Sequence, residues 1–313
     1  MQSLKSAFLH QKILKSTMNK PVRLPAFAKI NLHLQVLGRR ADGYHELRTI
    51  FQAISLQDTL ELSRSPHPGI SLETDDPSLP AGPENLVYRA IDSIGHAIGF
   101  RGGVHAQLEK RIPVARGLGG GSSDAASAII GMLRLTKTKM PLRQVVEIAA
   151  GLGADVPFFL FGGRALAVNR GDEIYPLPDV ARRAVLVVSP RDIGVSTKDA
   201  YQWLSAELTN RPEHPNIWGF CALCWSRQGK VSNDFEGPVF RRHPRLGEIR
   251  DGLLKRGAAD AALAGSGSAV FGIFRNPAQA RRAARAFPED SAFVAKTLSR
   301  EEYGRALSWR ASG

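Results

Sequence analysis

The chain has 313 residues, of which 43% are apolar and 23% are charged, proportions typical of a globular protein with one large or two modest domains. No apolar run reaches the roughly 18 residues that a membrane-spanning helix needs. The net charge of +13 includes five basic residues and no acid within residues 1–25, and the rest is spread diffusely. This pattern indicates a solvated basic surface or attraction of a small polyanionic substrate. A basic RNA-binding protein would need a basic stripe interleaved with exposed aromatic residues, whereas only 7% of this chain is aromatic.

Residues 1–24 are predicted to be a disordered basic leader, because they contain no acid and no long apolar segment. This composition argues against secretion and favours a bacterial cytoplasmic protein. A plastid-type transit peptide and a natural start at Met18 stay open as alternatives.

The two cysteines, Cys221 and Cys224, are spaced Cys-x-x-Cys within an apolar stretch. No paired histidines accompany them, and the surroundings are not those of a thioredoxin-like redox motif. We expect two buried structural thiols, and the sequence predicts no protein metal site.

The first third of the chain is expected to be largely β. Alternating apolar residues predict half-buried strands over 30–36, 54–62 and 104–108. Apolar residues at helical spacing predict a helix between 87 and 98.

A glycine-rich turn at 113–121 runs directly into a segment that predicts a helix over 123–135. Its glycines carry no Cβ, so backbone N–H groups can converge on one anion, and Ser122, Ser123 and Asp124 are helix-capping types. The helix N-terminus adds unpaired N–H donors and the positive end of its dipole. No lysine follows Gly121 as in a Walker A loop, and Ser122 stands where a dinucleotide fingerprint needs its third glycine. We interpret the turn as a phosphate cradle of a third type.

The rest of the chain predicts a second, α+β unit. Proline punctuation at 175–179 marks the expected boundary between domains at 25–180 and 181–313. The elements expected after the glycine turn are a helix over 142–150, strands over 165–168 and 184–188, a helix over 236–256, strands over 261–263 and 269–274, a helix over 277–286 and a strand over 292–295.

Three motifs together resemble those of the GHMP kinases: AFAKINL at 26–32, the glycine turn, and LAGSGSAVF at 263–271. The resemblance runs from about residue 25 to the C-terminus. It implies a two-domain α+β fold, in which an N-terminal ribosomal-protein-S5-domain-2-like domain with a left-handed β-α-β unit precedes a C-terminal ferredoxin-like α/β sandwich. It also implies ATP as the phosphoryl donor, with Mg²⁺ brought in by the nucleotide.

Two further segments, GRRADGYHEL at 38–47 and GADVP at 153–157, resemble one branch of that family. This branch phosphorylates the 2-hydroxyl of a cytidine diphosphate-linked methylerythritol in the non-mevalonate isoprenoid pathway. The alternative is another small-molecule kinase of the family, of the homoserine or mevalonate type. The segment at 43–45 discriminates between them, because those carboxylate substrates have no base to stack. The resemblance implies a monomer or weak homodimer without nucleic-acid or membrane partners.

The resemblance makes Asp155 the catalytic base and Lys29 its charged neighbour. A carboxylate can accept the alcohol proton during phosphoryl transfer, and an ammonium can keep that carboxylate ionised. From the residues alone, Asp155 can equally be a helix cap and Lys29 a surface lysine.

The remaining assignments are also implied by the resemblance. Tyr44 and His45 would meet the cytidine, and Tyr201 would lie on the other face of the base, or else be an amphipathic tyrosine on a helix. Asn31 would bind substrate, and Asn85 and Lys110 the adenine side, although an asparagine can simply cap or brace. Asp124 is expected to accept backbone N–H groups and to point away from the phosphates. The expected ATP-binding residues of the turn are Pro113, Ala115, Gly117, Leu118, Gly119, Gly120, Gly121, Ser122 and Ser123, and the late motif supplies Gly265, Ser266 and Gly267 to the substrate.

Overall fold

The computed structural model describes residues 20–208, 220 and 230–309. Cys221, Cys224 and most of the predicted leader lie outside these ranges. The predicted leader is too long, because residues 22–24 form the start of the first strand. There Leu24 is buried and Arg23 donates to Glu109. Among the described residues, no helix is long and apolar enough to cross a membrane.

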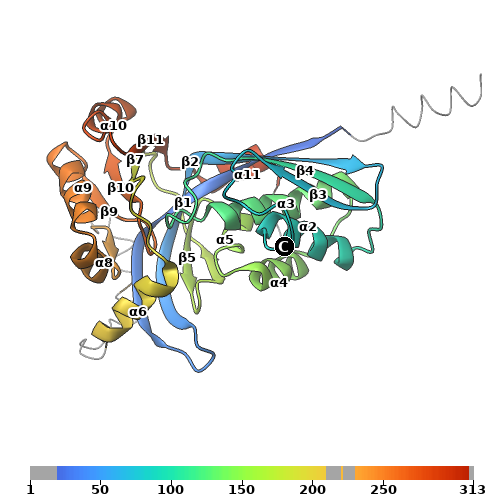
Figure 1. The fold of residues 1–313 in the computed structure, drawn as a ribbon, viewed down its shortest axis with the longest axis horizontal. Helices are drawn as coiled ribbons and strands as arrows, with labels where there is room; N and C mark the ends of the chain where they lie inside the picture. Colours follow the sequence, from blue (N-terminus) through green and yellow to red (C-terminus); the bar gives the residue numbers. More distant parts are fainter. Residues whose placement is uncertain (1–19, 209–219, 221–229, 310–313) are drawn as a thin grey trace, which may run out of the picture.

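The first sheet has seven strands, in the order β3-β4-β2-β1-β8, with β5 paired to β2 and β6 paired to β5 (Figure 1). β1 and β2 form one long antiparallel hairpin, and β3 and β4 are parallel partners joined through α2. The strands are β1 (Val22–Arg39), β2 (His45–Ser65), β3 (Gly69–Thr74), β4 (Gly103–Glu109), β5 (Arg164–Val168), β6 (Glu173–Pro176) and β8 (Ser232–Asn233). The first two predicted strands were too short because the middles of β1 and β2 are buried on both faces, so apolar and polar residues do not alternate there.

Helices pack with this sheet around one apolar core. They are α2 (Leu86–Ala97), α3 (Gly120–Thr136), α4 (Leu142–Leu152), α5 (Phe158–Phe161) and α11 (Arg300–Leu307). The last helix had no counterpart in the sequence analysis. It begins with a capping box made by Ser299 and Glu302, and it buries Tyr303 and Leu307 in the core. The division at residue 180 stays a prediction, but the end of the chain packs in the first core.

The second sheet has the order β11-β7-β10-β9, with every neighbouring pair antiparallel. Its strands are β7 (Ala184–Ser189), β9 (Asp260–Leu263), β10 (Val270–Phe274) and β11 (Ser291–Lys296), and its helices are α6 (Thr197–Leu208), α8 (Glu236–Arg242), α9 (Pro244–Lys255) and α10 (Pro277–Ala284). The helices follow β7 and β10, so the unit is the expected ferredoxin-like β-α-β-β-α-β sandwich. Leu186 and Val188 join the core with these helices, whereas Val185 and Val187 pack with residues of β1.

The single helix predicted over 236–256 is wrong, because the structure has two helices there. His243 adopts φ −130° and ψ 73° between them, and Pro244 opens the second helix. A proline disfavours the helical conformation of the residue before it and has no N–H for the preceding turn.

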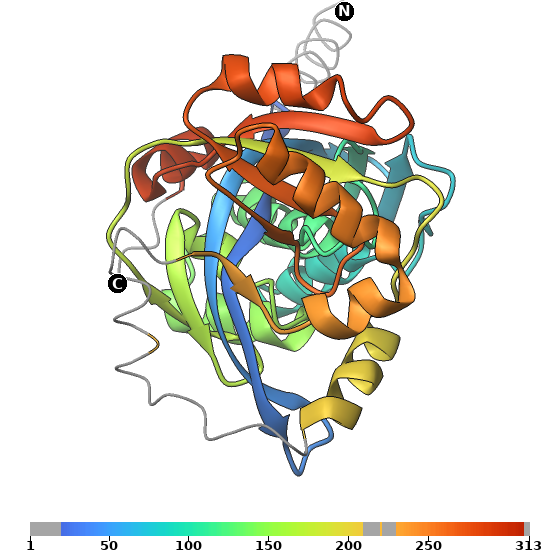
Figure 2. The same cartoon turned by 90° about the vertical axis from the view of Figure 1, so that its left-hand side faces the viewer.

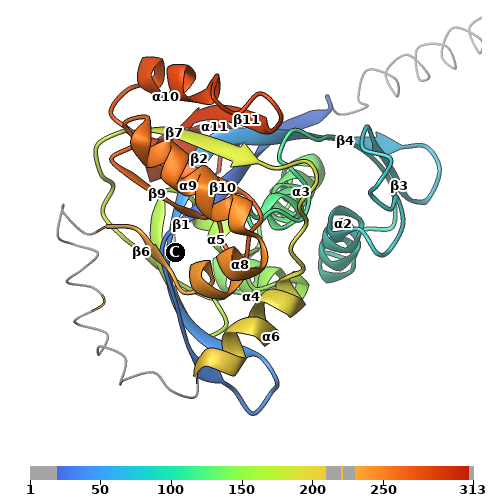
Figure 3. The same ribbon diagram turned by 60° about the vertical axis from the view of Figure 1, so that its left-hand side comes forward.

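The two units are joined along β2 and β11. Ile54 forms an isolated bridge with Thr297, and the Lys296 N–H donates to Ser55 Oγ at 3.0 Å. At the other end, α6 lies beside the tip of the β1–β2 hairpin in all three views (Figures 1, 2 and 3). These contacts enclose the space in which the predicted site residues gather.

Candidate active site

A cavity of about 1360 Å³ lies between the two units. Every residue that the sequence analysis assigned to the site lines it, apart from Ser123 and Gly267. Ser123 is fully buried in α3, and Gly267 donates its N–H to the Ala264 carbonyl within its own loop. The fold therefore brings segments from widely separated parts of the chain, from Lys29 to Ser266, to one space.

The glycine turn ends in α3 earlier than predicted. Gly119, at φ 73°, is the N-cap, and the helix runs from Gly120. Ser122 and Ser123 therefore lie in the first turn and Asp124 lies just beyond it, and none of the three caps the helix. The Ser123 N–H donates to the Gly119 carbonyl, so the N–H groups of residues 120–122 precede the first intrahelical bond and are free to bind an anion.

Two glycines of the turn are required by packing within the protein. At Gly117, φ 79°, a Cβ would lie 1.9 Å from the Ala264 carbonyl oxygen. At Gly119 it would lie 2.8 Å from Phe159 and 3.0 Å from Lys29 Cγ. The turn thus fits between the late glycine motif and the lysine, which fixes the helix N-terminus relative to both.

Lys29 and Asp155 lie next to each other in the lining of the cavity. Lys29 Nζ is 3.5 Å from Asp155 Oδ2 and donates to Asn31 Oδ1 at 2.8 Å. Asn31 in turn donates to Thr49 Oγ1 at 2.8 Å. Lys29 is only 4% exposed, so it is not a surface lysine. The following helix, α5, has Pro157 as its N-cap without a side-chain cap bond, so Asp155 does not cap it.

The aromatic end of the cavity lies where the β1–β2 hairpin meets α6. The His45 and Tyr201 rings stack with centroids 4.5 Å apart, and the Tyr201 ring meets Phe235 edge-on at 4.8 Å. His45 Nε2 shares a hydrogen bond with Ser205 Oγ at 2.8 Å. Burial, followed by the charge of Arg39, lowers the pKa of His45. Because His45 and Tyr201 touch, no base fits between these two rings in this conformation, whereas Tyr44 is 56% exposed.

A buried ionic cluster lies under the start of α3. Lys110 Nζ donates to Asp58 Oδ2 at 2.5 Å and to Asp124 Oδ2 at 2.7 Å. Asp58 Oδ1 also accepts the backbone N–H groups of Arg111 and Ile112. Asp124 does not accept backbone N–H groups as expected, since its Oδ2 binds Lys110 and its Oδ1 has no partner among the described residues. Burial raises the pKa of Asp124 to about 8.

The side-chain amide of Asn85 forms hydrogen bonds with backbone groups close to it in the chain. Its Oδ1 accepts the Val87 N–H and its Nδ2 donates to the Pro80 carbonyl, so it caps α2 while also lining the cavity. The capping role that the sequence left open is therefore confirmed. The adenine contact stays a prediction.

The late glycine motif is tied to the turn and to α6. Arg116 Nη1 donates to Ser268 Oγ at 2.7 Å, and Ser266 Oγ shares a hydrogen bond with Thr197 Oγ1 at 3.1 Å. Asn233 donates to the Gly265 carbonyl at 2.7 Å. These bonds hold the second unit's loop at the cavity wall.

Sequence reasoning missed the partners of the predicted residues. Thr49, Asp58 and Ser205 hold Asn31, Lys110 and His45 respectively, and Arg170 lies over the Tyr44 ring. A lone Thr, Asp or Ser in a strand or helix carries no local signal of a partner far along the chain. Only Asp58 gave a hint, because it takes an apolar position in the alternation predicted over 54–62. A carboxylate buried there needs a partner for its charge.

Comparison with known proteins identifies the class. The model of the GHMP kinases N terminal domain matches residues 85–163, and that of the GHMP kinases C terminal domain matches residues 217–291. Fold and site together thus define a small-molecule kinase of the GHMP type, an enzyme that uses ATP.

The relatives narrow this further. A 4-diphosphocytidyl-2-C-methyl-D-erythritol kinase of Solibacter usitatus (strain Ellin6076) is 44% identical over 92% of this chain and 91% of its own. One of Moorella thermoacetica (strain ATCC 39073 / JCM 9320) is 42% identical over 88% and 98%. A crystal structure of a 4-(cytidine 5'-diphospho)-2C-methyl-D-erythritol kinase has a TM-score of 0.74 and 38% identity, covering 88% of this chain and 98% of that one. The chain belongs to the 4-diphosphocytidyl-2-C-methyl-D-erythritol kinase family of GHMP kinases.

Proposed function

We propose that this kinase transfers the γ-phosphoryl group of ATP to the 2-hydroxyl of 4-diphosphocytidyl-2-C-methyl-D-erythritol. The observation that carries the proposal is the position of the Lys29–Asp155 pair. It lies in one cavity between the open N-terminus of α3 and the aromatic side chains at the hairpin tip. A donor phosphate and a nucleoside-bearing acceptor can therefore meet at the pair from opposite ends.

Asp155 is the proposed base. Its side chain is 33% exposed and faces the cavity, so it can accept the proton of a bound hydroxyl as the oxygen attacks the γ-phosphorus. Lys29 is buried beside it, where its positive charge can offset charge on the transferring phosphoryl oxygens. Asn31 holds the ammonium in place through its Oδ1.

The triphosphate would lie at the start of α3. The N–H groups of residues 120–122 and the helix dipole suit an anion, and the hydroxyl of Ser122 lines the same space. Mg²⁺ would arrive with the nucleotide and neutralise charge on the β- and γ-phosphates. The Ser122 hydroxyl at the same helix start is an oxygen donor of the kind that this hard cation accepts.

The cytidine would lie at the hairpin tip. Tyr44 offers an exposed ring for stacking, and His45 and Tyr201 form one continuous aromatic wall beside it. We place Tyr201 behind His45 and not across the base from Tyr44, because the two rings already touch. Gly265 and Ser266 would meet the acceptor near the phosphoryl group.

A coupled ADP-release assay tests the proposal. ATP is supplied with the cytidine substrate, with homoserine or with mevalonate, in parallel reactions. Turnover with the cytidine substrate at least a hundredfold above the other two supports the assignment. Preference for homoserine or mevalonate would contradict it and favour the alternative kinase type. The expected monomer or weak dimer, the lack of nucleic-acid partners and the cytoplasmic location stay predictions.

A further inference from the structure

We propose that Arg170 is a positioning residue for nucleoside recognition, which backs the Tyr44 ring from the β5–β6 turn. The guanidinium carbon of Arg170 lies 5.0 Å from the centroid of the Tyr44 ring, and both residues line the cavity. One face of the ring is covered by the cation, while the tyrosine as a whole is 56% exposed. The ring thus keeps an open face on which a base can stack. The inference rests on the proposed function.

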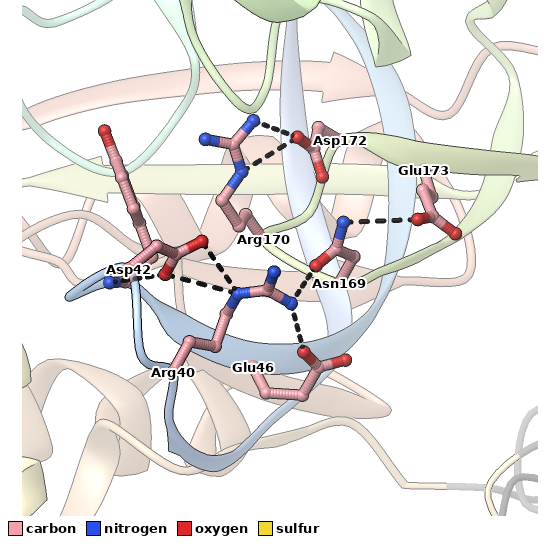
Figure 4. Close-up of polar contacts among 8 residues, drawn as sticks. Arg40, Asp42, Glu46, Asn169, Arg170, Asp172 and Glu173 are labelled. Carbon is pink, nitrogen blue, oxygen red and sulfur yellow. Dashed lines mark hydrogen bonds and ion pairs between the residues drawn. The ribbon is translucent and has the colours of Figure 1, made fainter.

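Arg170 is itself held by a neighbour in the same turn. Its Nε and Nη2 donate to Asp172 Oδ2 at 3.0 and 2.5 Å, and the Asp172 side chain is 9% exposed (Figure 4). A paired, fork-shaped guanidinium has few rotamers left. It therefore supports the tyrosine ring from a fixed position.

A second set of bonds ties the turn to the hairpin tip. Arg40 donates to Glu46 and Asp42 on the hairpin and to Asn169 Oδ1 on the β5–β6 turn (Figure 4). The Asn169 carbonyl accepts the Leu47 N–H at 2.8 Å. Two segments more than a hundred residues apart are thereby joined on both sides of Tyr44.

The tip carrying Tyr44 is fixed from within as well. The Tyr44 N–H donates to Asp42 Oδ1 at 3.1 Å, and its carbonyl accepts the Arg40 N–H at 2.8 Å. The backbone of Tyr44 is therefore anchored to the hairpin, and its ring is anchored by Arg170. Such preorganisation lowers the ordering cost that a stacking base would otherwise incur.

Kinetics of Arg170→Ala in the full chain test this role. An exposed cation–π contact corresponds to about a two- to fivefold change in affinity. We expect KM for the cytidine substrate to rise by about that factor, with KM for ATP unchanged and the effect absent from kcat. Arg170→Lys retains a cation and should recover part of the loss. Arg64→Ala is the matched control, because Arg64 lies over Phe100 at 5.3 Å in a similar pair that does not line this cavity.

A double-mutant cycle with Tyr44→Ala separates positioning from direct contact. If Arg170 acts through the ring, the double variant binds the cytidine substrate no worse than Tyr44→Ala alone. Additive losses of affinity in the double variant would show that Arg170 contacts the substrate directly and would overturn the proposal. The proposal is also overturned if Tyr44→Ala raises KM for the cytidine substrate while Arg170→Ala leaves it unchanged. A Tyr44→Ala variant with unchanged KM would overturn the nucleoside assignment itself, and this inference with it.

Discussion

Lys29 Nζ lies 3.5 Å from Asp155 Oδ2, with the lysine side chain 5% exposed and the aspartate side chain 33% exposed. The cation is thus enclosed by protein, while its carboxylate partner opens into the cavity. A buried ammonium needs such compensation, and the Asn31 oxygen and the Phe51 ring, whose centroid lies 5.0 Å from Lys29 Nζ, add to it. The pair therefore presents its carboxylate openly to a reacting hydroxyl, while Lys29 lines the same cavity from a more buried position.

Replacing Asp155 by Asn should reduce kcat by about 10²–10⁴-fold, since the amide keeps the shape but cannot accept the proton. KM for both substrates should change little. Steady-state kinetics measure this, with Asp92→Asn on the exposed face of α2 as a control that retains activity. The base assignment is contradicted if Asp155→Asn keeps more than about a third of the wild-type kcat.

Gly119→Ala should weaken ATP binding, because its Cβ would press on Phe159 and on Lys29 Cγ and move the helix start. We expect KM for ATP to rise about tenfold, equivalent to about 1.4 kcal/mol. Gly257→Ala is the matched control, since Gly257 has φ +89° with open space around it. Both variants should lose stability through the left-handed backbone, and equal KM values for ATP would refute the proposed cradle.

His45 should make recognition of the cytidine substrate sensitive to acid. Burial lowers the pKa of His45 below its usual 6.5. The ring is therefore neutral at pH 7 and becomes charged only at a pH below 6.5. The folded form favours the neutral ring, and KM for the cytidine substrate should therefore be flat from about pH 7 to 8.5 and rise in acid. His45→Gln, measured over the same range, should lose this dependence. KM for ATP serves as the internal reference. If KM for the cytidine substrate still rises in acid in His45→Gln, the dependence comes from another group.

Asp124 should make the protein less stable as the pH rises. Its pKa is raised from 3.8 to about 8, so the folded state holds a proton that the unfolded state has already lost between these values. The stabilisation that this group contributes is fully present below its pKa in the unfolded state. It is lost as the pH rises to its pKa in the folded state. Asp124→Asn should thus lose less unfolding free energy than the wild type between about pH 5 and 8, measured by urea denaturation. Asp76→Asn is the control, because hydrogen bonds from Ser78 hold the pKa of Asp76 low, and its slope should match the wild type.

The hydroxyl of Tyr303 should contribute to stability, since it donates to the Phe159 carbonyl at 2.7 Å from a fully buried position. Tyr303→Phe strands that carbonyl and should cost about 1–3 kcal/mol. Tyr175→Phe removes a hydroxyl from a 52% exposed residue and should leave the melting temperature unchanged. Indistinguishable melting temperatures for the two variants would show that the hydroxyl of Tyr303 contributes nothing.

The sequence by itself determined the features that depend on local backbone demands. The glycine turn running into a helix, the alternation within β1 and the β-α-β-β-α-β order of the second unit all follow from residues close together in the chain. The resemblance to the GHMP kinases, which rests on short motifs, implied the site residues, and most of these line the cavity. The start of α3 was predicted at 123 instead of 120, because a left-handed glycine sets that boundary. The starts of β1 and β2 were predicted at 30 and 54 instead of 22 and 45, because both faces of these strands are buried there.

Only the tertiary structure decided which side chains meet. Tyr201 stacks on His45, Asp58 and Asp124 share Lys110, and Arg170 covers Tyr44, and each of these contacts joins different elements of the fold. The same holds for α11, whose Tyr303 completes a core formed mainly by the first unit. Such partnerships follow from how sheets and helices pack in three dimensions, and a buried charge or hydroxyl has to find its partner there because water is excluded.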